Sequence, residues 1–109
     1  APVEPLDPIR AFHAAVTRQD ANGAPSGGWH PSEGLARSTA LRAHTQGPAY
    51  AAFQEDEVGS ISVGKRADFV VLSQDLMTVP ADRLLDTEVV ATYLGGTPVH
   101  RQPNWPDAQ

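Results

Sequence analysis

The stretch with the strongest suggestion of chemistry is GSISVGKR, residues 59–66. Four residues separate its two glycines and a lysine follows the second, as in a loop that binds phosphate. In such a loop Ser or Thr follows the lysine to hold Mg²⁺, and a helix begins there whose N-terminal amides bind the anion. Here Arg66 follows Lys65, and the apolar run that comes next predicts a strand. The pattern therefore favours a turn with both basic side chains in solvent over a phosphate site.

The sequence lacks a complete set of residues for a metal site or for a catalytic nucleophile. No two histidines stand at the i, i+2 or i+4 spacings that place two imidazoles on one metal, and cysteine and a Gly-x-Ser-x-Gly segment are absent from the sequence. His44 lies on the apolar face of a predicted helix, which predicts a packed, hydrogen-bonded core histidine, and His13 and His100 are expected at the surface. His30, beside Trp29, is the histidine whose setting suggests function. We therefore expect no catalytic residue and no metal ligand in this chain.

The elements that would position these residues begin with a helix and a long loop. Asp7 is predicted as the N-cap and Pro8 as the first position of a helix that ends near Arg18. Residues 19–34 contain several turn dipeptides and no hydrophobic period. Loops of this length inside compact domains are often functional, and a disordered connector is the equal alternative.

The middle of the chain predicts a second helix followed by a change of period. The helix covers residues 37–46, and Gly47-Pro48 is expected to end it. Further along, Ile61 and Val63 alternate with serines, which predicts a half-buried strand or turn.

The last third of the chain predicts extended structure. The run ADFVVL, residues 67–72, reads as a strand whose continuous apolar end indicates burial on both faces. Residues 80–82 are expected to open a one-turn helix. Residues 89–101 predict a hairpin whose turn is Gly95-Gly96, since tight hairpin turns require positive φ.

Composition narrows the classes of function. The chain has 109 residues and a formal net charge of -5, which predicts one small domain. The acidic balance argues against nucleic acid and anionic membrane surfaces as partners, because both need clustered Lys and Arg. Apolar runs stay well short of the roughly 20 residues that cross a membrane. We expect no nucleic-acid or membrane partner, and a cytoplasmic location.

Two segments together resemble a known family. GSISVGKRADFVVLS, residues 59–73, and VVATYLGGTPVH, residues 89–100, are similar to the C-terminal signature of the amidohydrolase superfamily of metal-dependent hydrolases. The preceding segment, residues 35–53, resembles the family's helix before that signature, although Ala36 replaces the usual capping hydroxyl and Thr39 the usual Glu. The motif positions, which the resemblance implies are structural, are Gly59, Gly64, Lys65, Ala67, Asp68, Gly95 and Gly96.

The N-terminal part resembles amidohydrolase family 3, in its YtcJ-like or exoenzyme-regulatory branch. Ala1-Pro2-Val3 match the end of that branch's Gly-Ser-Asp-x-Pro-Val segment, whose Asp is associated with the metal and water. The Gly-Ser-Asp would lie immediately before residue 1. The resemblance therefore carries no catalytic residue or metal ligand onto this chain.

The resemblance implies an α+β fragment. Residues 1–56 would be the end of a (β/α)8 barrel, with its last helices and a rim loop, residues 57–102 the C-terminal strands of a small β-sandwich, and residues 103–109 a tail. Active sites of such barrels lie at the C-terminal ends of the strands. The candidates for the mouth of the substrate site are Pro2, Val3, Trp29 and His30.

The implied function belongs to a longer parent enzyme. That enzyme would hydrolyse C–N bonds, in amides or cyclic amides, with water activated by zinc or another divalent metal. The segment itself would bind no cofactor and would be structural and inactive. Its partners would be the remainder of the parent chain, the parent's small-molecule substrate, and a second copy through exposed apolar surface. The alternative is a free-standing α+β module that binds through its edge strands without catalysis.

Overall fold

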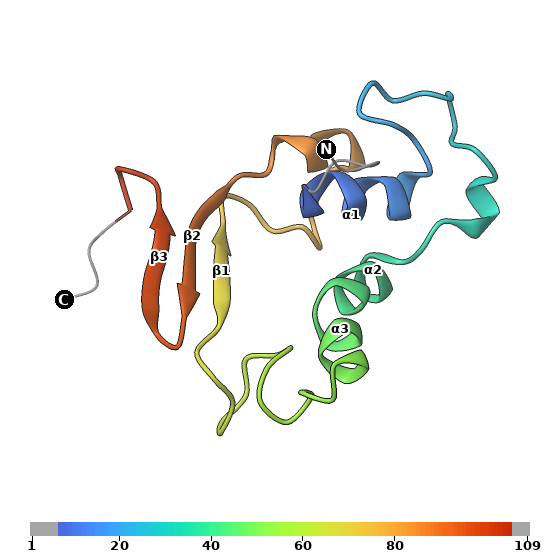
Figure 1. The fold of residues 1–109 in the computed structure, drawn as a ribbon. Helices are drawn as coiled ribbons and strands as arrows, with labels where there is room; N and C mark the ends of the chain where they lie inside the picture. The colour runs from blue at the N-terminus through green and yellow to red at the C-terminus, as the bar shows by residue number, and fades with distance from the viewer. Residues whose placement is uncertain (1–6, 106–109) are drawn as a thin grey trace, which may run out of the picture. The chain divides into compact units, whose positions relative to one another are not determined.

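A computed structural model describes residues 7–105 and shows two compact units. The first contains residues 7–44 and 76–87, and the second contains residues 45–75 and 88–105. The first unit is helical, and the second contains a three-stranded antiparallel sheet (Figure 1). The predicted α+β class is confirmed.

Helix α1, Pro8–Thr17, begins and ends where the sequence predicts. The Asp7 carboxylate accepts a hydrogen bond from the Ile9 N–H at 2.9 Å, and the proline at the first position lacks the N–H that a helix start leaves unpaired. At the other end Arg18 adopts a left-handed conformation, φ 59°, and its N–H donates to the Ala14 carbonyl at 2.8 Å. Local capping thus fixes both ends of this helix.

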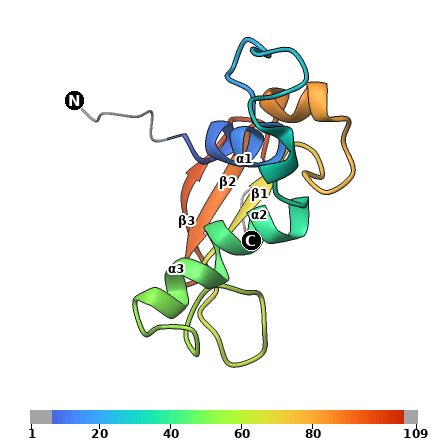
Figure 2. The ribbon, with the colours of Figure 1, turned by 90° about the vertical axis from the view of Figure 1, so that its right-hand side faces the viewer.

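The buried side of α1 is wider than predicted. Ile9 and Phe12 are buried, and so is His13, which is only 5% exposed. The expected surface position of His13 is therefore wrong. Helix α1 packs against both α2, Arg37–His44, and the 3₁₀-helix η2, Ala81–Asp86, which Figure 2 shows beside it. Because two elements pack against α1, they also bury side chains beside the apolar stripe that the sequence predicted.

The segment 76–87 joins the first unit although it lies far along the chain. Leu76 is buried, and the Arg37 guanidinium donates to its carbonyl oxygen at 3.0 Å and also to that of Val79. Leu84, in η2, is fully buried. The helix predicted to open at residues 80–82 is confirmed.

Helix α2 places His44 differently from the prediction. Its Nδ1 lies 2.9 Å from the Ala40 carbonyl oxygen, and its ring centroid lies 6.4 Å from that of Phe12. The residue is nevertheless exposed, whereas Ala40 is fully buried. The predicted core position of His44 is wrong, because the whole last turn of α2, residues 41–44, is exposed.

The second unit begins with helix α3, Gln46–Ala51, which contains Gly47-Pro48. The predicted helix end at this dipeptide is therefore wrong. The chain leaves helical geometry earlier, at Thr45 (φ -128°, ψ -78°), and Pro48 then falls in the first turn of a new helix. First-turn N–H groups have no acceptor within the helix, so proline is tolerated there.

The sheet has the order β1-β2-β3, with β1 at Phe69–Leu72, β2 at Val89–Leu94 and β3 at Thr97–Arg101 (Figure 1). Both pairs are antiparallel, and each contains one irregularity of register. The predicted hairpin is confirmed. Its turn residues Gly95 and Gly96 have φ 57° and 82°, which side chains disfavour.

One face of the sheet is well packed. Phe69 stacks on Tyr93 with ring centroids 4.7 Å apart, and Ala91 beside them is fully buried. The Tyr93 hydroxyl accepts a hydrogen bond from Trp105 Nε1 at 2.8 Å. Val70, which alternates with Phe69 along β1, is 51% exposed, so the predicted burial of this strand on both faces is wrong. Within the described residues, β1 is an edge strand with a neighbour on one side only.

The segment before β1 is a series of turns. Ile61 is 87% exposed and Val63 fully so. Of the two predicted alternatives, the half-buried strand is wrong and the turn is confirmed. The Lys65 N–H donates to the Ser62 carbonyl at 3.1 Å, which closes a turn instead of pairing with a neighbouring strand. Two alternating apolar residues are too few to impose a strand against this local hydrogen bonding.

Candidate functional site

The loop after α1, residues 18–34, is built on its own hydrogen bonds. One oxygen of the Asp20 carboxylate accepts the backbone N–H groups of Asn22 at 2.8 Å and Ala24 at 3.0 Å. These hydrogen bonds, the one from Ala24 above all, lower the pKa of Asp20 because they stabilise its ionised form. The Asp20 N–H in turn donates to the Ala24 carbonyl at 2.8 Å. The segment thus folds as a defined loop.

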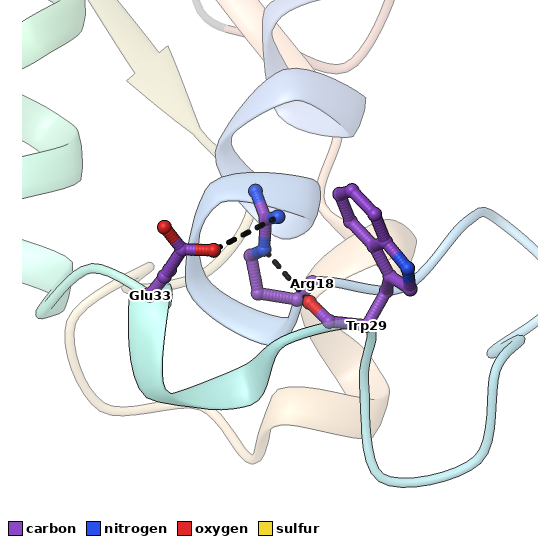
Figure 3. Close-up of polar contacts among 3 residues, drawn as sticks. All are labelled: Arg18, Trp29 and Glu33. Carbon is purple, nitrogen blue, oxygen red and sulfur yellow. Dashed lines mark hydrogen bonds and ion pairs between the residues drawn. The ribbon is translucent and has the colours of Figure 1, made fainter.

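Arg18 holds the loop to the end of α1, as Figure 3 shows. Its backbone carbonyl accepts the Trp29 N–H at 2.9 Å, and its Nε donates to the Trp29 carbonyl at 3.0 Å. Its guanidinium carbon lies 5.2 Å from the centre of the indole ring, within the range of a cation–π interaction. The Glu33 carboxylate lies 4.0 Å from the other side of the guanidinium. A single side chain thus fixes both the backbone and one face of Trp29.

The two predicted site residues of the loop lie together and face solvent. Trp29 is 61% exposed, and the His30 ring meets it edge-on with centroids 4.4 Å apart. His30 has φ 47°, a conformation that non-glycine residues seldom adopt and that often marks functional positions. Gly28 lets the loop pass close to α1, since a Cβ there would lie 2.5 Å from the Thr17 carbonyl oxygen.

This arrangement offers an aromatic contact surface and an imidazole. Among residues 7–105, no group of three or more His, Cys, Asp or Glu side chains could hold a metal ion, so this donor set does not fit the metal that the family resemblance implies. Pro2 and Val3, the other predicted mouth residues, lie outside the described residues. No helix in the described part of the chain has the combined length and apolar character needed to cross a bilayer.

The motif residues connect the start of β1 to the hairpin turn. Asp68 accepts the Gly95 N–H at 2.7 Å, and the Gly96 N–H donates to the Ala67 carbonyl at 2.9 Å. Lys65 Nζ donates to the Ser60 hydroxyl at 2.9 Å. All the motif residues lie in the second unit: Gly59, Gly64, Lys65, Ala67, Asp68, Gly95 and Gly96.

Sequence reasoning missed Arg18, Asp20 and His13. The sequence predicted only that a helix ends near Arg18. Its side-chain contacts could not be predicted, because their partners lie further along a loop that has no periodic pattern. Asp20 carried a usable signal, since Asp side chains often accept the backbone N–H two residues later in a turn, and Asn22-Gly23 is a turn dipeptide. His13 carried none, because its burial depends on segments distant in sequence.

Comparison with known proteins gives the class of protein. The sequence model of the amidohydrolase family matches residues 1–100. The N-substituted formamide deformylase of Arthrobacter pascens is 35% identical over 95 residues, which are 87% of this chain and 17% of that protein. YtcJ of Bacillus subtilis (strain 168) is 31% identical over 102 residues, 94% of this chain and 19% of that protein.

A solved structure agrees with these relatives. The crystal structure of an amidohydrolase from Thermotoga maritima MSB8 matches with a TM-score of 0.55 and 31% identity, over 65% of this chain and 17% of that one. The chain belongs to the amidohydrolase family, as its motifs predicted. It spans only 17% to 19% of the length of these relatives.

Proposed function

We propose that this chain is the C-terminal part of a metal-dependent amidohydrolase that works in the cytoplasm and hydrolyses C–N bonds of amides or cyclic amides with metal-activated water. The observation that carries the proposal is the family match over residues 1–100, combined with coverage of 17% to 19% of the relatives' length. Hydrolysis is the activity of the whole protein. The metal, zinc or another divalent ion, would be held by residues beyond the described part of this chain.

In this proposal the chain is a structural part of the parent. Residues 1–56 form the end of a (β/α)8 barrel, residues 57–102 the C-terminal strands of a β-sandwich, and residues 103–109 a tail. The exposed side chains of the second unit support a covering partner, since Tyr50 is 72% and Phe53 92% exposed. The occupant that we propose is the remainder of the parent polypeptide, because most of the relatives' length lies outside the matched region.

Trp29 and His30 are proposed to lie at the mouth of the parent's substrate site. Their support is the exposed indole, the strained backbone of His30 and the rigid attachment of the loop to α1. A relative named for N-substituted formamides makes this small-molecule class the first to assay.

The test measures hydrolysis by the full-length protein. N-substituted formamides, open-chain amides and cyclic amides are assayed before chelation, after chelation and after zinc is restored. We expect hydrolysis of at least one class, its loss on chelation and its return with zinc. Hydrolysis that survives complete metal removal would refute the metal-dependent proposal.

A second experiment separates a structural part from a free-standing module. Residues 1–109 produced alone are expected to associate, to bind no stoichiometric metal and to hydrolyse none of the substrates. A monomeric chain that unfolds cooperatively would favour the free-standing α+β module instead. Association as a defined dimer would identify a second copy as the partner of the apolar surface.

A further inference from the structure

The first unit contains a cavity separate from the Trp29 surface. Its volume is about 390 Å³, and it lies between α1, the start of the following loop and η2. Cavities of roughly 300 to 1,000 Å³ are typical of sites for small molecules. The lining that matters for its chemistry is Arg10, His13, Ala14, Asp20, Ala21 and Leu85.

Two opposite charges border this cavity without pairing. Among the described residues, Arg10 and Asp20 do not form an ion pair within 4.0 Å, although both line the same space. One oxygen of Asp20 is occupied by two backbone N–H groups, which also hold the carboxylate in place and keep its pKa low. The second oxygen has no hydrogen-bond partner in the described part of the chain. The cavity is thus lined by the fixed carboxylate of Asp20 and by the guanidinium of Arg10, which is not paired with it.

A buried polar side chain adds a third group. His13 is 5% exposed and lines the cavity. Its ring nitrogens form no hydrogen bond with residues 7–105, and neither nitrogen is fully buried, since no fully buried side-chain nitrogen among these residues lacks a partner. Burial lowers the pKa of the imidazole, against the opposing effect of Asp20. The ring is therefore neutral at neutral pH and offers one N–H donor and one acceptor.

We propose that this cavity binds a small zwitterion of the α-amino acid type. The ligand's carboxylate would be bound by Arg10 and by the His13 N–H, and its ammonium group by the free oxygen of Asp20. The methyl and isobutyl groups of Ala14, Ala21 and Leu85 would contact its side chain. A ligand with one charge would pair with only one of these two side chains, so both charges contribute to recognition. The site does not depend on the proposed hydrolysis.

The test is calorimetric titration of the full-length protein at low salt with L-alanine, acetate and methylammonium. Because Arg10 and Asp20 are exposed to solvent, we expect L-alanine to bind with a Kd of about 1 mM. Each single-charge ion is expected to bind about tenfold more weakly, and salt should weaken binding of L-alanine.

Variants identify where L-alanine binds. Arg10→Gln removes the cation, and Asp20→Asn removes the anion while keeping an oxygen for the two backbone N–H groups. We expect each to weaken binding about fivefold or more. Arg42→Gln changes an exposed arginine of α2 outside the cavity and is the matched control. It should bind L-alanine as tightly as the unsubstituted protein does.

Three results would overturn the proposal. The first is the absence of any heat of binding up to about 100 mM L-alanine. The second is L-alanine binding that neither Arg10→Gln nor Asp20→Asn weakens. The third is binding of acetate or methylammonium as tight as that of L-alanine. Circular dichroism checks that each variant is folded. If Asp20→Asn fails to fold, Arg10→Gln decides alone. Because the titration measures binding, a protein without hydrolytic activity would still bind L-alanine in this cavity.

Discussion

Replacing Arg18 with alanine is expected to loosen the loop after α1 while leaving the helix folded. The side chain is the connection between the helix end and Trp29 through its Nε–H, which donates to the Trp29 carbonyl at 3.0 Å. It also covers the indole at 5.2 Å and approaches Glu33 at 4.0 Å. Alanine removes all three interactions and keeps the backbone hydrogen bond from Trp29 to residue 18.

The three interactions differ in strength. The hydrogen bond from a charged donor is the largest, at about 1 to 1.5 kcal/mol for a side chain that is 28% exposed. The cation–π contact adds about 0.5 kcal/mol at an exposed site. The ion pair adds almost nothing, because the Glu33 side chain is 67% exposed and the distance is at the limit. The loop should therefore lose about 1 to 2 kcal/mol of local stability, which makes its opening roughly tenfold more frequent.

Hydrogen exchange of the full-length protein measures this opening. The reporter is the Trp29 N–H, which donates to the Arg18 carbonyl at 2.9 Å, and exchange there should accelerate about tenfold in Arg18→Ala. Arg18→Lys keeps the charge near the ring but lacks the planar Nε–H, so its effect should be intermediate. Arg42→Ala, in α2, is the matched control. Unchanged exchange of Trp29 in a folded Arg18→Ala protein would refute the idea that this side chain holds the loop.

Three further outcomes follow from burial, hydrogen bonding and titration. Leu84→Ala removes a fully buried side chain and should lower the free energy of unfolding by about 2 to 5 kcal/mol in a denaturant titration; a loss below about 1 kcal/mol would contradict its core position. Asp68→Ala removes the 2.7 Å acceptor of the Gly95 N–H and should speed exchange of that amide about tenfold, whereas Asp68→Asn should retain most of its protection. Burial lowers the pKa of His13 below 6.5, so the unfolded chain takes up a proton first as the pH falls, and stability should decline as the pH falls through 6.5; His13→Gln should flatten that decline, and an equal slope in both proteins would contradict it.

Local signals explain which elements the sequence predicted. The start of α1 needs only Asp7 and Pro8, which are adjacent, and the hairpin needs only the Gly95-Gly96 pair between two apolar runs. Both structures form from interactions within a few residues. The burial of His13 needs η2, which follows far along the chain and is held by contacts with α1, so no window around residue 13 contains the information.

The candidate site divides in the same way. The sequence marked Trp29 and His30, since an aromatic residue and a histidine stand together between glycines, and the structure does bring them into contact. Trp29 is held by Arg18, eleven positions earlier in the chain, and no periodicity in the sequence indicates this contact. The cavity beside α1 was equally invisible, because Leu85 reaches it from a different part of the chain than His13 does.

The segment that identifies the family has a structural role. Asp68 accepts the Gly95 N–H and the Ala67 carbonyl accepts the Gly96 N–H, so these motif residues connect the entry to β1 with the turn between β2 and β3. Its apolar residues behave differently, since Ile61 and Val63 alternate as core residues would and yet are exposed. Alternation indicates that side chains can be buried but not which chain segment covers them. That difference accounts for two wrong expectations, a β1 strand buried on both faces and a half-buried strand at residues 61–63.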